Sequence, residues 1–134
     1  MSGTSRGSGI ELIRNLYEAR NRGDLESVRS ALAEGVVWHE PEVDSEHTGK
    51  LRGPAAVLAM IKEAQRLTGG TFRLIPREVV ANGEHVVALV DWSATRGGGR
   101  LEGREVAVYR IRSGKVVEVH FHQDDPDLDR QFWD

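Results

Sequence analysis

The sequence predicts an α+β domain in which three N-terminal helices pack on a strongly curved, mostly antiparallel sheet and enclose a pocket. Up to about residue 67, apolar residues recur every three to four positions, as in helices with one buried face. From Thr71 onward the period changes to two, and turn sequences separate four long β-rich runs. The helices must cover the apolar face of this sheet, and a sheet that curves strongly leaves an opening between the two layers.

The first part of the domain is predicted to be a helical hairpin. The apolar stripe of its first helix consists of Ile10, Ile13, Leu16 and Tyr17. Gly23 ends this helix, and the Asp24 carboxylate can accept from the free N–H groups that begin the next one. The apolar stripe of the second helix consists of Leu25, Val28 and Leu32.

A short strand and a third helix are expected next. Residues 36–39 are β-branched and aromatic, and Pro41 ends the run. Residues 42–52 are polar and aperiodic, which predicts a loop. Pro54 suits the first position of a helix because its missing N–H is not needed there, and the apolar stripe continues to Leu67.

Four β-rich runs then predict an antiparallel meander. They cover residues 71–80, 84–95, 100–112 and 115–123. The connections Asn82-Gly83, 97–99 and Ser113-Gly114 favour the positive φ angles of hairpin turns. Asp125-Pro126 can begin a last helical turn that packs back on the domain.

Composition narrows the possible functions. A chain of 134 residues with 39% hydrophobic residues suits one domain, which we place at 10–134 after a flexible tail at 1–9. A net charge of −3 disfavours nucleic acid as a partner, and the absence of cysteine excludes disulfides, thiolate catalysis and sulfur-bound metals. The longest apolar runs are far shorter than the ~20 residues that cross a bilayer, and the N-terminus has no secretion signal. We expect a cytoplasmic protein that binds no membrane.

Several local sequences resemble one family. These local sequences are residues 37–39, 51–54, 67–72, 82–89 and 109–116, together with Phe132-Trp133 near the C-terminus. These segments are similar to actinobacterial SnoaL-like proteins, within the nuclear transport factor 2-like superfamily that also contains ketosteroid isomerases. The resemblance implies a cone-shaped fold around a small-molecule pocket. It does not choose an activity, since this fold serves isomerases, cyclases, dehydratases, hydrolases and binding proteins.

The resemblance to ketosteroid isomerases implies one catalytic carboxylate. It lays the Asp-Pro general base of that family on Glu40-Pro41, so Glu40 is the first catalytic candidate. Strand alternation places Trp38 on the same face as Glu40 and turns His39 away. The electrophilic groups of that family would fall near Ala107 and Leu16, which cannot supply them.

The resemblance to SnoaL-like polyketide cyclases implies a second candidate. The final strand has histidines where that scheme places an aspartate, and a neutral imidazole can act as acid or base at neutral pH. His120 is therefore the second catalytic candidate. The expected substrate contacts are Trp38, His39, Tyr17, Trp92, Tyr109 and His122. One β-bulge would exchange the faces of His39 and Glu40, or of His120 and Phe121.

The remaining features favour neither a metal nor a cofactor. His120-x-His122 with Glu118 has the spacing of metal ligands, but outward-facing histidines in an interface explain it equally well, so we expect no metal. Asp91 should face outward and pair with an arginine. Apolar residues on the outer sheet face predict a homodimer through that face.

Two functions remain open at this stage. One is a cofactor-independent isomerase, cyclase or dehydratase that moves a proton on a hydrophobic, carbonyl-bearing substrate. The other is a binding or carrier module for an apolar small molecule. A protein-interaction scaffold is a weaker third, because no large basic patch or exposed apolar helix is present.

Overall fold

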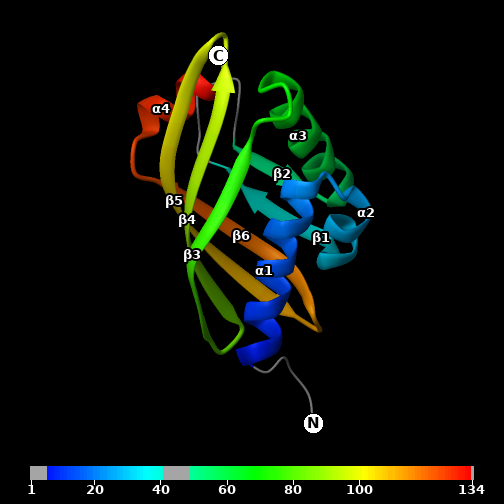
Figure 1. The fold of residues 1–134 in the computed structure, drawn as a ribbon. Helices are drawn as coiled ribbons and strands as arrows, with labels where there is room; N and C mark the ends of the chain where they lie inside the picture. The colour runs from blue at the N-terminus through cyan, green and yellow to red at the C-terminus, as the bar shows by residue number, and fades with distance from the viewer. Residues whose placement is uncertain (1–5, 41–48, 134) are drawn as a thin grey trace.

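The computed structural model describes residues 6–40 and 49–133 and shows helices packed across a curved six-stranded sheet (Figure 1). The four helices of the described residues are α1 (Arg6–Arg22), α2 (Leu25–Ala31), α3 (Pro54–Leu67) and α4 (Pro126–Trp133). The six strands are β1 (Leu32–His39), β2 (Lys50–Arg52), β3 (Arg73–Asn82), β4 (His85–Arg96), β5 (Gly99–Arg112) and β6 (Lys115–Gln123). The α+β class is confirmed, and α4 follows the sheet where Asp125-Pro126 predicted a last helical turn, so the described residues form four helices and not three.

The helical hairpin starts earlier than the sequence indicates. Helix α1 begins at Arg6, so residues 6–9 belong to the helix and not to the predicted tail. Gly9 is buried, and a residue without a side chain contributes nothing to an apolar stripe. Asp24 caps α2 as predicted, since its Oδ1 accepts from the Ser27 N–H at 3.2 Å. The rest of the predicted tail, residues 1–5, lies outside the described residues.

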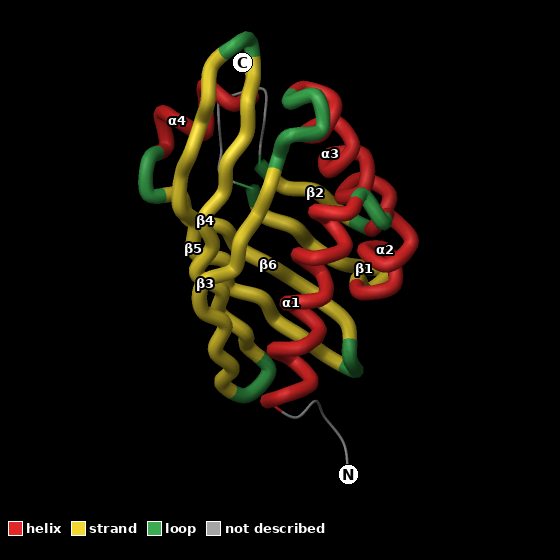
Figure 2. Tube along the Cα trace, viewed as in Figure 1, coloured by secondary structure: helices red, strands yellow, loops and turns green. Residues whose placement is uncertain are grey.

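The sheet has the order β2-β1-β6-β5-β4-β3. Strands β3 to β6 form the predicted antiparallel meander, and β1 joins its far side by pairing in parallel with β6. Strand β2 corrects the sequence prediction, because Lys50–Arg52 pairs with β1 where a loop was expected. Three residues are too few for a period of two to show. Figure 2 shows α1 crossing the sheet and α2 and α3 beside β1 and β2.

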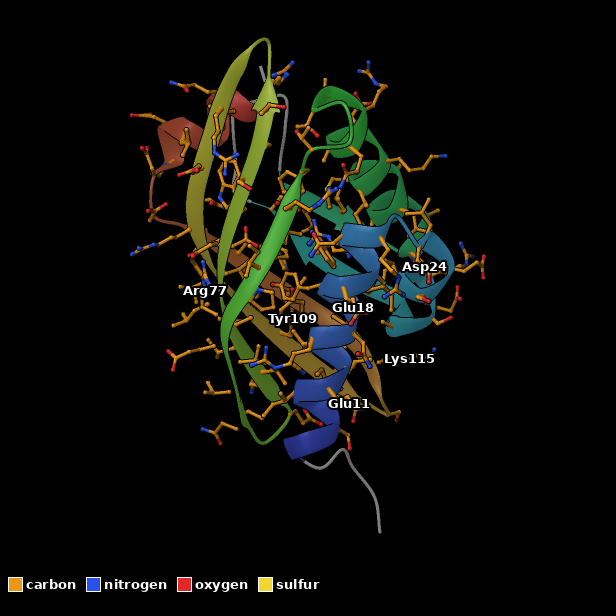
Figure 3. The ribbon with its side chains drawn as sticks, in the orientation of Figure 1. Glu11, Glu18, Asp24, Arg77, Tyr109 and Lys115 are labelled. Carbon is orange, nitrogen blue, oxygen red and sulfur yellow. The ribbon has the colours of Figure 1, made fainter. Side chains whose placement is uncertain are left out.

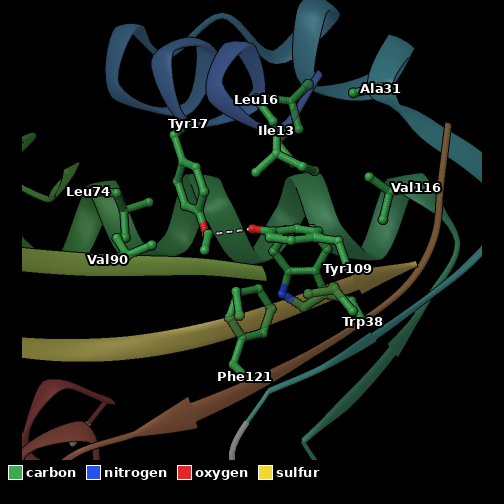
Figure 4. Close-up of a cluster of buried hydrophobic side chains, with 14 of the residues drawn as sticks. Ile13, Leu16, Tyr17, Ala31, Trp38, Leu74, Val90, Tyr109, Val116 and Phe121 are labelled. Carbon is green, nitrogen blue, oxygen red and sulfur yellow. Dashed lines mark hydrogen bonds between the residues drawn. The ribbon is translucent and has the colours of Figure 1, made fainter. Parts of the chain in front are cut away.

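The core fills the space between these helices and the sheet. Tyr17 of α1 and Tyr109 of β5 meet there through their hydroxyl groups, which are 2.6 Å apart (Figure 4). Trp38 and Phe121 pack beside this pair, with ring centroids 5.0 Å apart. Trp38 and both tyrosines are completely buried.

The opposite sheet face carries polar and exposed apolar groups. Asp91 points outward and accepts from the Arg77 Nε at 2.6 Å, as predicted. Figure 3 shows Arg77 on the side of β3 away from α1, and Tyr109 between the strands and α1. In the described part of the chain, no helix is long and apolar enough to cross a membrane.

Candidate functional site

A cavity of about 40 Å³ lies between the helices and the concave sheet face. Its apolar wall consists of Met60, Ala64, Phe72, Leu74, Trp92 and Phe121. Its polar wall consists of Arg20, Glu40, Glu105 and Gln123. This volume holds about one to three water molecules. The described residues therefore combine a small, mostly apolar space with four convergent polar side chains.

Glu40 brings a carboxyl group to this cavity directly after the end of β1. Its Oε1 accepts a hydrogen bond of 2.6 Å from the indole N–H of Trp38, two residues earlier on the same strand face. Burial raises the pKa of the Glu40 carboxyl, while the Trp38 N–H and the positive charge of Arg20 oppose that rise. A carboxyl with a raised pKa is suited to exchange protons with a bound molecule.

Arg20 brings a positive charge to the same cavity from α1. Its side chain is only 7% exposed, and its guanidinium carbon lies 5.5 Å from the centroid of the Trp38 ring, within cation–π distance. Its Nε atom is buried, and no residue in the described part of the chain accepts a hydrogen bond from it. Arg20 follows Leu16 and Tyr17 by four and three positions, so it shares the helix face that packs on the sheet.

Glu105, Gln123 and Trp92 form a hydrogen-bonded chain along the sheet side of the cavity. The Trp92 indole N–H donates to Gln123 Oε1 at 3.1 Å, and Gln123 Nε2 donates to Glu105 Oε1 at 2.8 Å. Glu105 is a second carboxyl group in the site and is only 8% exposed. Phe72 stacks on the Trp92 ring at 6.1 Å. This chain fixes the orientation of one wall of the cavity.

The two tyrosines named as substrate contacts lie deeper than the cavity wall. Tyr109 donates its hydrogen bond to the Tyr17 hydroxyl, and neither residue lines the cavity. Burial is the main cause that raises the pKa of both phenols, so both stay protonated at neutral pH. Trp38 is also absent from the wall and reaches the site through its bond to Glu40.

The histidines lie on the other side of the sheet. His120 and His122 alternate along β6 with Val119 and Phe121, which are buried. Because Phe121 and Gln123 face the cavity, His120 and His122 face outward, and this geometry places His120 where it cannot move a proton in the cavity. The pairing of β5 with β6 shifts between Arg110 and Ile111, where Val117 is the extra residue on β6. From Glu118 to Gln123 the pairing is regular, so no bulge separates His120 from Phe121. Strand β1 has a register shift of its own between Leu32 and Val37.

One group of outward-facing side chains has the composition of a metal site. The side chains of His39, Glu118 and His120 offer ligand atoms within 4.8 Å of one another. The sequence suggested Glu118, His120 and His122 as the set, and the structure has His39 in place of His122. The Glu118 carboxylate lies 2.9 Å from His39 Nε2 and 3.6 Å from His120 Nε2. The hydrogen bond from His39 is the main cause that lowers the pKa of Glu118. The contacts of the Glu118 carboxylate with both imidazoles hold the three side chains together.

Sequence reasoning missed three of the four polar residues of the site, although their periodicity contains the signal. Glu105 precedes Ala107 and Tyr109 by two and four positions on an inward face of β5, and Gln123 follows Phe121 by two on β6. Arg20 shares the apolar face of α1. Charged and amide side chains on an apolar face mark a buried polar site, because burial without a partner is unfavourable.

The fold and the cavity define a class of small α+β proteins with a cavity between their helices and a curved sheet. A family model for the SnoaL-like domain matches residues 13–119. The chain belongs to the SnoaL-like family, and its fold is nuclear transport factor 2-like.

Individual relatives agree with this assignment. Protein Rv0034 of Mycobacterium tuberculosis (strain H37Rv) is 27% identical over 127 residues, which are 92% of this chain and 95% of that protein. The structure of Bal32a, from a soil-derived mobile gene cassette, has a TM-score of 0.89 and 28% identity, and the match covers 96% of this chain and 98% of Bal32a. IdmH of Streptomyces antibioticus, a candidate polyketide cyclase, has a TM-score of 0.77 and 26% identity, covering 92% and 97% of the two chains.

Proposed function

We propose that this protein is a cofactor-independent enzyme that moves a proton on a hydrophobic, carbonyl-bearing small molecule of polyketide or steroid type. The observation that carries the proposal is the Glu40 carboxyl, which lies in a mostly apolar cavity with a pKa above its usual range. The similarity to a candidate polyketide cyclase supports the substrate class. The reaction class is isomerisation, ring closure or dehydration.

The chemistry begins at the carbon next to the carbonyl group. Glu40 in its ionised form takes a proton from that carbon, the C–H bond breaks, and its electron pair moves into the carbonyl group to form an enolate. The Trp38 N–H occupies Oε1, which leaves Oε2 to accept the proton. Return of the same proton to another carbon gives the isomer. Attack of the enolate carbon on a second carbonyl group closes a ring, and the alkoxide that forms takes the proton from Glu40.

Substrate entry requires side chains to move. Small-molecule pockets usually measure about 300–1,000 Å³, and the cavity of about 40 Å³ is far smaller. Met60 and Phe72 line it and are only partly buried, so they lie where it opens. A flat ring system can replace Phe72 against the Trp92 ring, on which Phe72 stacks at 6.1 Å. The proposed substrate is therefore flat and largely apolar.

The test compares Glu40→Gln with the wild type. Exchange of the α-hydrogens for deuterium is measured by NMR on a panel of flat ketones, together with ligand affinity from tryptophan fluorescence. We expect Glu40→Gln to lower the exchange rate about 100-fold or more, with affinity unchanged, because Gln keeps the shape but cannot take a proton. Glu78→Gln removes an exposed carboxylate from β3 and serves as the matched control. An unchanged rate in Glu40→Gln would remove Glu40 as the base.

A second candidate function is binding without chemistry. Leu16 and Ala107 occupy the places where the resemblance to ketosteroid isomerases would put electrophilic groups, and both are buried apolar side chains. A module that only carries an apolar molecule needs no such groups. Recovery of every panel ligand unchanged and without deuterium, despite measurable binding, would favour this function.

We also propose that two copies associate through the outer sheet face. Ile75, Val80, Leu89 and Val106 are large apolar residues exposed there by 36–56%. A second copy would remove this apolar surface from water. A cytoplasmic setting stays a prediction from the sequence.

A further inference from the structure

The guanidinium group of Arg20 lies in the site, and the chemistry above gives it no role. It lines the cavity, its side chain is 93% buried, and its Nε atom has no hydrogen-bond partner. A buried N–H donor without a partner is unfavourable by roughly 1–3 kcal/mol, and more where the group is charged. Proteins retain such donors mainly where a ligand, an ion or a water supplies the acceptor.

The surroundings of Arg20 hold the charge in place without satisfying it. The Trp38 ring supports one side of the guanidinium through its π face, which offers no lone pair to Nε. The nearby titratable groups are Glu40, Glu105, Tyr17 and Tyr109, each of which is linked to Arg20 by through-space electrostatics or shares the cavity with it. Glu40 and Glu105 already accept from Trp38 and Gln123, respectively. Thus, among residues 6–40 and 49–133, none accepts a hydrogen bond from the buried Nε atom of this cation.

Charge balance selects the kind of acceptor. With both carboxyl groups ionised, the cavity contains two negative charges and one positive charge, so a permanently anionic ligand adds to the excess. A neutral ligand that gives its proton to Glu40 changes no net charge. The negative charge then moves from the carboxylate to the ligand oxygen, where a guanidinium N–H stabilises it.

We propose that Arg20 is the oxyanion-binding residue of the site and that its ligands are neutral enols, phenols or enolisable ketones that ionise when they bind or react. Arg20 would thereby supply the electrophilic function that Leu16 and Ala107 cannot. The inference rests on the proposed proton transfer at Glu40 for its catalytic meaning. Its ligand specificity can be tested separately.

In the proposed step, one proton and one electron pair move. The ligand C–H or O–H bond breaks, its proton joins Glu40 Oε2, and its electron pair ends on the oxygen that accepts from Arg20. Apolar side chains around this oxygen exclude water, which strengthens the interaction with the guanidinium. No oxidant, metal or second substrate is required.

The experiment uses 4-nitrophenol, whose visible absorption distinguishes the phenol from the phenolate. Its binding is titrated with wild type, Arg20→Met, Arg20→Lys and Glu40→Gln below the pKa of the free phenol. Nitrobenzene, which has the same ring without the hydroxyl group, reports whether the cavity stays intact. Arg22→Met is the matched control, because Arg22 lies on the same helix but is exposed and pairs with Glu18 and Asp24.

We expect the wild type to bind the phenolate form, so that the absorption shifts to longer wavelength at a pH where the free ligand is mostly phenol. Arg20→Met should lose this shift and bind the phenolate about tenfold more weakly or worse, with nitrobenzene affinity unchanged. Arg20→Lys should restore part of the effect, because it keeps the charge. Arg22→Met should behave as wild type.

Two results would overturn the inference. One is a wild-type protein that binds 4-nitrophenol no better than nitrobenzene. The other is Arg20→Met that keeps both the shift and the phenolate affinity. The proposed function fails in a different way: Glu40→Gln leaves deuterium exchange unchanged while Arg20 still controls phenolate binding. If Arg20→Met also loses nitrobenzene binding, the cavity itself is disturbed, and Arg20→Lys becomes the test variant. The inference is then contradicted if Arg20→Lys recovers nitrobenzene binding but not the shift of the 4-nitrophenol absorption.

Discussion

A single residue pair, Trp38 and Glu40, sets the acid–base behaviour of the site. The two side chains are on one face of the chain at the end of β1, and the indole N–H donates directly to the carboxyl group. This bond favours the ionised form of Glu40, while burial favours the neutral form. The positive charge of Arg20 also favours the ionised form, so the pKa of Glu40 results from opposing causes that substitutions can separate.

We predict that Trp38→Phe raises the pKa of Glu40 further. The substitution keeps an aromatic ring but removes the N–H donor that stabilises the Glu40 carboxylate. The Glu40 carboxyl group therefore stays protonated up to a higher pH. A base must be ionised to act, and activity is lost as the pH falls through its pKa. The acidic limb of the rate profile should therefore move to higher pH, and ¹³C NMR of the labelled Glu40 carboxyl should show the same direction.

Trp92, which lines the cavity, provides the control for this prediction. Trp92→Phe also removes an indole N–H, but that donor serves Gln123 and not Glu40. The titration of Glu40 should stay close to that of the wild type in Trp92→Phe. Equal shifts in the two variants, or no shift in Trp38→Phe, would contradict the role given to the Trp38 N–H.

At the scale of the elements, the sequence predicted those parts whose periodicity is long. The meander of β3 to β6 and the helix Pro54–Leu67 are confirmed, because many alternations or turns repeat the same signal. Strand β2 was missed because it is three residues long, and the start of α1 because Gly9 adds nothing to an apolar stripe. The short β2 depends on its pairing with β1, which its own three residues do not reveal.

The candidate site was predictable to a smaller extent. Glu40 follows from its match to a family motif, and the structure places it in the cavity. The face of His120 was not predictable, because it depends on the pairing of β6 with its neighbours and not on the order of residues alone. Arg20, Glu105 and Gln123 become recognisable only when three separate elements meet at one cavity.

Strand β5 contains a glycine that the cavity wall requires. A Cβ atom at Gly103 would lie 2.6 Å from the Trp92 Nε1 and 2.7 Å from the neighbouring ring carbon, closer than real contacts allow. We predict that Gly103→Ala displaces the Trp92 ring and lowers the free energy of unfolding by about 1–3 kcal/mol. Chemical denaturation and near-UV circular dichroism measure the two effects.

Gly99 provides a matched control on the same strand. A Cβ atom there meets only the Arg96 carbonyl oxygen, at an ordinary 3.7 Å. Gly99→Ala should therefore leave the stability and the Trp92 signal nearly unchanged. If Gly103→Ala were equally neutral, Trp92 would not be held by close contact with the β5 backbone.

At the scale of the whole molecule, the two faces of the sheet serve different purposes. The concave face and the helices enclose the cavity, whereas the outer face combines exposed apolar residues with the His39, Glu118 and His120 group. Leu89 and Val106 are direct cross-strand partners in the middle of that outer face. His122 is the partner of Val106 on the next strand. The apolar surface is thus continuous across β4 and β5 and is bordered by titratable groups on β6.

We predict that Val106→Lys prevents the association of two copies. In a twofold interface the lysine is present in both copies. Association would bury both of its charges in an apolar surface, which is unfavourable. Sedimentation equilibrium over a wide concentration range should give the mass of a dimer for the wild type and of a monomer for Val106→Lys.

The control is Ala59→Lys, on the exposed side of α3, which should remain dimeric. A wild-type mass equal to one chain at every concentration would contradict the dimer, whereas loss of the dimer in both variants would place the interface elsewhere. Because the cavity opens on the opposite side of the sheet, the monomeric variant should keep the phenolate affinity of the wild type.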